Sequence, residues 1–216
     1  MSLLQTASRV LFIGDSITDA GRDRGDPRDL GGGYPRVVAQ TYAENSEGGP
    51  VTFLNRGISG NRVRDLRERW QADCLDLKPD VVSIMIGVND TWRRYDSGDP
   101  TSVEAFGRDY RAILQATVDN SRAALVLVEP FLLPVRPGQD SWREDLDPKI
   151  AVVRRLAADH DATLVPLDSV LTHAATTRAA DELAADGVHP TPAGHALIAR
   201  TWLETVDAQP QTPIAW

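Results

Sequence analysis

Short apolar segments alternate with amphipathic segments along the chain. Five largely aliphatic and β-branched runs lie at residues 10–13, 51–54, 81–86, 125–128 and 163–165. Runs of this length that are apolar on both faces are typical of parallel strands buried on both sides of a sheet. The stretches between them carry helical periodicity, at about residues 34–44, 63–75, 103–120, 142–160 and 192–206. The pattern therefore predicts five strand–helix repeats.

This alternation predicts an α/β fold, a three-layer α/β/α sandwich around a five-stranded parallel sheet with right-handed crossovers. The last helix has a clear start signal, because Thr191 is a suitable N-cap and Pro192 suits the first helical position. A chain of 216 residues without repeats or long linkers is expected to form a single domain over residues 1–216. In such sheets ligands bind beyond the carboxyl ends of the strands.

Composition narrows the choice of partners. The chain has 31 acidic and 23 basic residues and a formal net charge of -8, which argues against nucleic-acid binding. Of the basic residues 21 are arginine, and GC-rich codon usage explains this excess better than an arginine-rich recognition surface does. Cys74 is the one cysteine and cannot form an internal disulfide. The sequence has no signal-peptide or membrane-span pattern, so we expect a cytoplasmic protein without a membrane partner.

Four polar segments that contain glycine follow predicted strands or precede the last helix, at residues 14–19, 55–61, 87–90 and 186–190. They supply Ser16, Asp186 and His189, the side chains of a serine hydrolase. A serine hydroxyl needs a base to remove its proton, and His189 is the candidate. Asp186 lies three residues earlier, so one tight turn can bring its carboxylate to the imidazole and fix the tautomer.

The same segments supply candidate donors for an oxyanion. We expect the backbone N–H groups of Ser16 and Gly57 and the side-chain amide of Asn89 to converge on the developing negative charge. Glycine at position 57 would let the backbone approach the substrate closely.

The four segments resemble the sequence blocks of the SGNH (GDSL) hydrolase family, with Ser16, Gly57, Asn89 and His189 as the matching residues in order. The resemblance implies a flavodoxin-like fold and a serine esterase that uses no cofactor and no metal. Within the family, the chain is similar over nearly its whole length to bacterial acetylxylan esterases that act on acetylated xylooligosaccharides. The segments that carry this similarity are residues 11–19, 57–61, 82–90 and 188–195.

Other protein classes share some of these features. A two-metal phosphoesterase would also place aspartate and asparagine at strand ends, but it needs more histidine ligands than this chain offers there. An α/β-hydrolase is excluded because the chain has no Gly-x-Ser-x-Gly elbow. A lysophospholipase or thioesterase on the same fold, and a sugar-binding relative without catalysis, stay open as alternatives.

The segment around Asn89 suggests the substrate. Trp92, Arg93 and Tyr95 form a polar, aromatic loop that would suit a small-molecule acylated carbohydrate, although Trp92 could equally pack beneath the loop. Asp15 is a candidate either for a substrate contact or for bonding the loop backbone. Relatives that form rings imply a homo-oligomer, in which Trp216 could anchor an interface.

Overall fold

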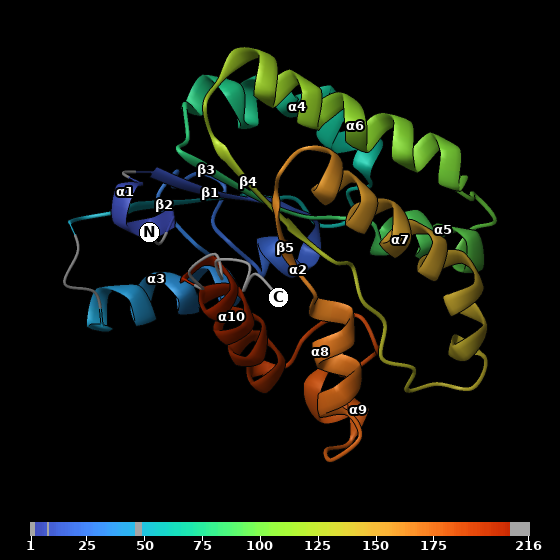
Figure 1. Cartoon of the computed structure of the whole chain (residues 1–216). Coiled ribbons are helices and arrows are strands. Elements are labelled where there is room, and N and C mark those ends of the chain that lie inside the picture. The colour runs from blue at the N-terminus through green and yellow to red at the C-terminus, as the bar shows by residue number, and fades with distance from the viewer. Residues whose placement is uncertain (1–2, 8, 46–48, 208–216) are drawn as a thin grey trace, which may run out of the picture.

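A five-stranded parallel sheet with the strand order β2-β1-β3-β4-β5 forms the centre of the protein in the computed structural model (Figure 1). The structure describes residues 3–7, 9–45 and 49–207. Each predicted apolar run overlaps one strand, and every neighbouring pair is parallel. The predicted α/β class and sheet are confirmed. The strands are β1 (Arg9–Gly14), β2 (Thr52–Gly57), β3 (Val81–Met85), β4 (Ala124–Val128) and β5 (Thr163–Val165).

Helices cover both faces of this sheet (Figure 1). One face carries α4 (Val63–Asp73), α6 (Val103–Asn120) and α7 (Arg143–Asp159). The other carries α1 (Leu3–Thr6), α3 (Tyr34–Asn45), α8 (Leu167–Ala174) and α10 (Pro192–Asp207). Shorter pieces lie in the connections: α2 (Ser16–Asp19), α5 (Val88–Asp96), α9 (Ala180–Leu183) and the 3₁₀ helices η1 (Leu75–Leu77) and η2 (Gln139–Trp142). None of the helices in the described ranges is long and apolar enough to cross a membrane.

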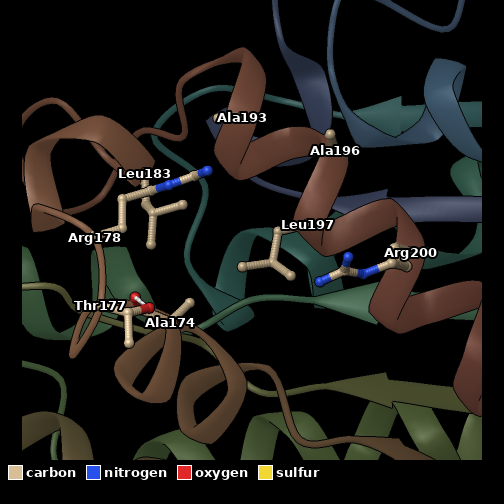
Figure 2. A pocket seen from close by; sticks show the side chains of 8 residues that line it. All are labelled: Ala174, Thr177, Arg178, Leu183, Ala193, Ala196, Leu197 and Arg200. Atoms are coloured by element: carbon tan, nitrogen blue, oxygen red, sulfur yellow. Dashed lines mark hydrogen bonds between the residues drawn. The ribbon is translucent and has the colours of Figure 1, made fainter.

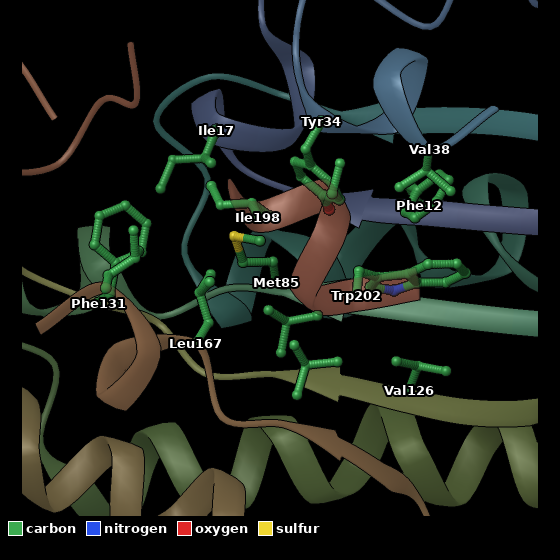
Figure 3. Close-up of a cluster of buried hydrophobic side chains, with 14 of the residues drawn as sticks. Phe12, Ile17, Tyr34, Val38, Met85, Val126, Phe131, Leu167, Ile198 and Trp202 are labelled. Atoms are coloured by element: carbon green, nitrogen blue, oxygen red, sulfur yellow. The ribbon is translucent and has the colours of Figure 1, made fainter. Parts of the chain in front are cut away.

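Alternate residues of β1 enter two separate cores, which is why the strand is apolar on both faces. Leu11 packs into the core under α4, α6 and α7, whereas Phe12 packs into the core under α3 and α10. Figure 3 shows Phe12 and Trp202 in the second core, and their ring centroids are 5.1 Å apart. The indole N–H of Trp202 donates to Ser83 Oγ at 2.9 Å, which fastens α10 to the middle strand β3.

Helix α5 differs from the sequence expectation, which treated residues 90–96 as a loop. The segment is rich in polar residues, but its first turn is buried, with Asn89 and Asp90 under 5% exposed. Gly87 allows the sharp entry from β3, because its φ is +132°. Arg93 and Arg94 stand in the last turn, where basic side chains complement the helix dipole. The polar composition of the segment therefore concealed a helix whose first turn is buried against the rest of the fold.

The strand order reverses between β1 and β3, and this point of an α/β sheet is where ligands bind. Gly14 ends β1 in register with Gly57 of β2 and Met85 of β3, so the loops that follow the three strands start at one level. A Cβ on Gly14 would lie 2.2 Å from the carbonyl oxygen of Met85, so only glycine permits this close approach.

Candidate active site

Ser16 is the first residue of α2 and follows β1 after a single residue. Asp15 caps this short helix, because its Oδ1 accepts the backbone N–H of Ile17 at 3.0 Å. The helix ends at Asp19, and the following residue Ala20 has a left-handed backbone with φ +42°. The strand-to-helix turn thereby holds Ser16 at the carboxyl edge of the sheet.

His189 and Asp186 lie in the turn that precedes α10. Asp186 Oδ1 accepts the backbone N–H groups of Val188 at 3.0 Å and His189 at 2.7 Å, and its Oδ2 lies 2.7 Å from the ring Nδ1 of His189. Gly187 makes the turn possible, since its φ is +90° and a Cβ there would lie 2.5 Å from the carbonyl oxygen of Leu133.

The candidate nucleophile Ser16 and the candidate base His189 lie within hydrogen-bonding distance of each other. Ser16 Oγ lies 2.9 Å from His189 Nε2. Because a carboxylate accepts at Nδ1, that nitrogen carries the ring proton and Nε2 is left to accept from the serine hydroxyl. Partial burial alone would raise the pKa of Asp186, but the hydrogen bonds from His189 and Val188 outweigh it and hold the pKa below its usual value. Asp186 is therefore an ionised carboxylate near neutral pH.

Asn89 lies in the first turn of α5, directly after β3. Its side-chain Nδ2 donates to the backbone carbonyl of Asn61 at 3.1 Å, and the side chain is buried. This bond ties the loop after β3 to the loop after β2. Because a primary amide has two N–H donors, one donor of Asn89 is left over.

Gly57 does not supply the free backbone N–H that the sequence predicted for the oxyanion. Its N–H donates to the side-chain Oδ1 of Asn55 at 2.8 Å in a buried position, so this donor is already used inside the protein. Asn55 also donates to the carbonyls of Thr18 and Leu30. Glycine is needed at position 57 for packing, because a Cβ would lie 2.2 Å from the backbone nitrogen of Asp19.

Gly60 is the glycine of this loop that the sequence analysis overlooked. Its φ is +83°, it is partly exposed, and its N–H has no hydrogen-bond acceptor among the described residues. It adjoins Asn61, whose carbonyl holds Asn89. The segment contains two glycines three residues apart, and spacing alone does not tell which one points its N–H outward.

Asp15 is 1% exposed, so it does not reach the cleft surface. Burial raises its pKa to about 7, and the bond from Ile17 and the nearby His189 offset this only in part. Its position fits the loop-bonding reading rather than a substrate contact.

The aromatic residues of α5 lie beside the histidine. The ring centroids of Trp92 and His189 are 5.6 Å apart, and Trp92 also packs on Trp142 of η2 at 5.6 Å. Tyr95 stacks on Trp142 as well, with 5.0 Å between their ring centroids. Arg93 forms an ion pair with Asp96. Trp92 is thus the member of this group that contacts the catalytic candidate, while Tyr95 belongs to the supporting stack.

An open cleft of about 530 Å³ contains Ser16 and His189 together with residues that the sequence analysis did not single out as site residues. Those residues include Asp19, Arg22, Arg24 and Ser59. Among the described residues, no group of three or more His, Cys, Asp or Glu side chains is arranged to hold a metal ion.

A second cavity, of about 540 Å³, lies between α8, α9 and α10 (Figure 2). Leu183 and Leu197 line it together with Arg178 and Arg200, and none of the expected site residues takes part. Trp216, the expected interface residue, lies outside the described residues.

Comparison with known proteins places these observations in context. The family model described as GDSL-like Lipase/Acylhydrolase matches residues 12–197. An acetylxylan esterase of Geobacillus stearothermophilus is 37% identical over 209 residues, which cover 93% of this chain and 94% of that protein.

Solved structures agree with that comparison. A putative GDSL-like lipase from Parabacteroides merdae superimposes with a TM-score of 0.88 and 38% identity, covering 92% of this chain and 94% of that one. The Geobacillus stearothermophilus acetylxylan esterase superimposes with a TM-score of 0.86 and 34% identity, covering 94% and 95%. Three variants of that esterase described as catalytic mutants replace a serine, an aspartate or a histidine, the last two being three residues apart.

Proposed function

Because the chain belongs to the GDSL-like lipase/acylhydrolase family and is thereby a carboxylic ester hydrolase, we propose that it removes acetyl groups from carbohydrates, with acetylated xylooligosaccharides as substrates. The observation that carries the proposal is the hydrogen-bonded line from Ser16 through His189 to Asp186, with distances of 2.9 Å and 2.7 Å, beside an open cleft. The full-length similarity to an acetylxylan esterase supports the choice of acyl group.

In the first half of the reaction, Ser16 Oγ attacks the ester carbonyl while His189 Nε2 takes its proton. Asp186 stabilises the imidazolium that forms, because it holds the Nδ1–H throughout. The protonated ring then gives its proton to the departing sugar oxygen, which leaves an acetyl group on Ser16. Water then attacks the acetyl carbonyl while His189 takes its proton, and as the bond from the acyl carbon to Ser16 Oγ breaks, His189 returns the proton to that oxygen and acetic acid leaves.

The negative charge on the carbonyl oxygen needs donors that are in place before the reaction. We assign them to the backbone N–H of Ser16, the backbone N–H of Gly60 and the side-chain amide of Asn89. Gly60 takes the part first expected of Gly57, because the Gly57 N–H is bonded to Asn55. Ser16 suits the part because the first N–H groups of a helix have no partner within it.

The character of the cleft favours a short acyl group on a hydrophilic alcohol. Its named lining is polar and charged, with Asp19, Arg22, Arg24 and Ser59 around the serine. A lysophospholipase or thioesterase would need an apolar groove for a long acyl chain.

The test is to measure hydrolysis of 4-nitrophenyl esters of increasing chain length and of acetylated xylooligosaccharides by the wild-type protein and by Ser16→Ala. Acetyl esters should be the best substrates, and the variant should lose activity while keeping its circular dichroism spectrum. Rising activity toward long chains would favour the lipid-type alternative. A wild-type protein that binds xylooligosaccharides but does not react with a fluorophosphonate would be a sugar-binding relative.

Chelation tests the expectation that the enzyme uses no metal or other cofactor. Dialysis against a chelator should leave the rate of acetyl ester hydrolysis unchanged, and a loss that added divalent metal restores would contradict the serine mechanism. Self-association and a cytoplasmic location remain predictions. Light scattering after size-exclusion chromatography tests the first, and cell fractionation tests the second.

A further inference from the structure

The cleft around Ser16 is positively charged although the whole chain carries a net charge of -8. Arg22 and Arg24 both line the cleft, and Asp19 is the one acidic residue among its lining residues. Arg56 also lies close enough to Arg22 for its charge to act on that group. A neutral acetylated sugar would not by itself call for such an arrangement.

Asp19 forms its ion pair with Arg24 and accepts the backbone N–H of Arg22, not its guanidinium. Its Oδ2 accepts a guanidinium N–H of Arg24 and the backbone N–H of Ser59 at 3.0 Å. Its Oδ1 accepts the backbone N–H of Arg22 at 3.2 Å. The Asp19 side chain is 7% exposed, so this set of bonds is protected from water.

The guanidinium of Arg22 is held by a hydrogen bond from Nε, whereas its two terminal nitrogens are available to a ligand. Its Nε donates to the carbonyl oxygen of Gly57 at 3.0 Å, which fixes the plane of the group at the end of β2. Within the described part of the chain, Arg22 forms no ion pair, and its two terminal nitrogens have no hydrogen-bond acceptor. Partial burial lowers the pKa of Arg22, and the neighbouring Arg56 and Arg24 lower it as well, while Asp19 and Asp73 offset this only in part.

Two arginines of α5, on the other side of the site, are paired with acids and do not share this property. Arg93 is paired with Asp96. Arg94 is paired with Glu144 and Asp145 at 2.9 Å and 3.1 Å. Of the two arginines that line the cleft, Arg24 is paired with Asp19, so Arg22 is the one that a ligand can reach without breaking an ion pair. Two parallel N–H donors in one plane match the two oxygens of a carboxylate.

We propose that Arg22 binds a carboxylate of the substrate, so that the preferred esters are acidic, such as an acetylated oligosaccharide that carries a uronic acid. This inference rests on the proposed esterase function and deepens it, since Arg22 and Ser16 line the same cleft. The carboxylate could stand on the sugar, as in a uronic acid, or on the acyl group, as in a hemisuccinate, and the experiment separates the two.

The experiment compares kcat/KM for three esters of matched size: an O-acetyl methyl xyloside, an O-acetyl methyl glucuronide and a hemisuccinyl ester of methyl xyloside. One of the two acidic esters should exceed the neutral ester by about tenfold, the usual scale of a charge-assisted contact. Preference for the glucuronide places the carboxylate on the sugar, and preference for the hemisuccinate places it on the acyl group. The preference should shrink when the salt concentration is raised.

Arg22→Gln should bring the acidic-to-neutral ratio close to one, and Arg22→Lys should restore part of it. The matched control is Arg28→Gln, which removes the same charge from a side chain that is 89% exposed and should keep the wild-type ratio. Melting temperatures establish that the variants are folded, and the ratio itself is independent of the amount of active protein.

Equal use of acidic and neutral esters by the wild-type enzyme would overturn this inference and leave the esterase function intact. An Arg22→Gln variant that keeps the wild-type ratio would overturn it as well. Failure to hydrolyse any of the esters, or 4-nitrophenyl acetate, would instead count against the proposed function.

Discussion

The carboxylate of Asp186 holds His189 at two points, its backbone N–H through Oδ1 and its ring Nδ1 through Oδ2, each at 2.7 Å. The first bond fixes the turn and the second fixes the ring. Asp186→Asn would keep an acceptor for the backbone but could present an N–H to the ring and favour the wrong tautomer. We expect kcat for 4-nitrophenyl acetate to fall by roughly 10³–10⁴-fold. A variant that retains more than a tenth of the activity would mean that another group orients the histidine.

Asn89→Ala tests the oxyanion assignment. Removing one donor to the developing charge should lower kcat by roughly 10²–10³-fold, with little change in KM, because the contact strengthens only in the transition state. The lost bond to Asn61 could also loosen the loop, so the melting temperature serves as a control. An equal rise in KM without a fall in kcat would assign Asn89 to ground-state binding instead.

Asp15 should make stability depend on pH. Its pKa is raised from 3.8 to about 7 by burial, so between these values the folded protein holds a proton that the unfolded chain releases. Raising the pH through this window therefore lowers the free energy of unfolding, and the loss is complete above about pH 7. Asp15→Asn cannot ionise, so its stability relative to wild type should increase from pH 4 to pH 7 in urea titrations. Burial also raises the pKa of Asp90 to about 7, but this residue is present in both proteins, so its titration cancels in the stability difference between them. A constant difference would mean that Asp15 does not titrate in this range.

Gln139 is expected to position the catalytic turn from η2. Its Oε1 accepts the N–H groups of Val135 and Arg136 at 2.9 Å, and its Nε2 donates to the carbonyl of Asp186 at 2.8 Å. Gln139→Glu keeps the acceptor and removes the donor. We expect lower kcat and a shifted proton resonance of His189 Nδ1–H, a signal that loss of stability alone would not move. Gln115→Glu, on the exposed surface, is the control.

Trp92→Ala separates a substrate role from a packing role. If the indole forms part of the sugar site, kcat/KM for an acetylated xylooligosaccharide should fall about tenfold more than kcat/KM for 4-nitrophenyl acetate, which has no sugar ring to stack. Trp142→Ala, which removes the neighbouring ring, provides the comparison. Equal losses for both substrates would mean that Trp92 acts through the position of His189.

The sheet was predictable because its strands are buried on both faces, which the residue pattern records directly. Phe12 and Leu11 belong to different cores, so neither face of β1 could be polar. Helix α5 escaped prediction because its buried turn contains Asn89 and Asp90, whose burial depends on partners elsewhere in the chain. One such partner is the N–H of Val63, which donates to Asp90 Oδ2.

Within the site, the approach of Ser16, His189 and Asp186 followed from the place of Ser16 after a strand, from the place of the other two before the last predicted helix, and from their short spacing. The direction of a single backbone N–H did not follow, because the bond from Gly57 to Asn55 exists only in the folded loop. For a related reason, the sequence does not show that Arg22 forms no ion pair within the described part of the chain. Several arginines lie close to Asp19 in the sequence, and the sequence does not show that Arg24 is the one that pairs with it.

The bond between Trp202 and Ser83 joins the last described helix to the middle strand, and His189 lies just before that helix. Ser16 and His189 are 173 residues apart, so the ribosome synthesises Ser16 long before His189. A nascent or truncated chain that lacks α10 cannot hold the two together, however well its first strands have formed. On the proposed mechanism, hydrolysis therefore requires that α10 has been synthesised and docked, so esterase activity reports the docking of this helix during folding.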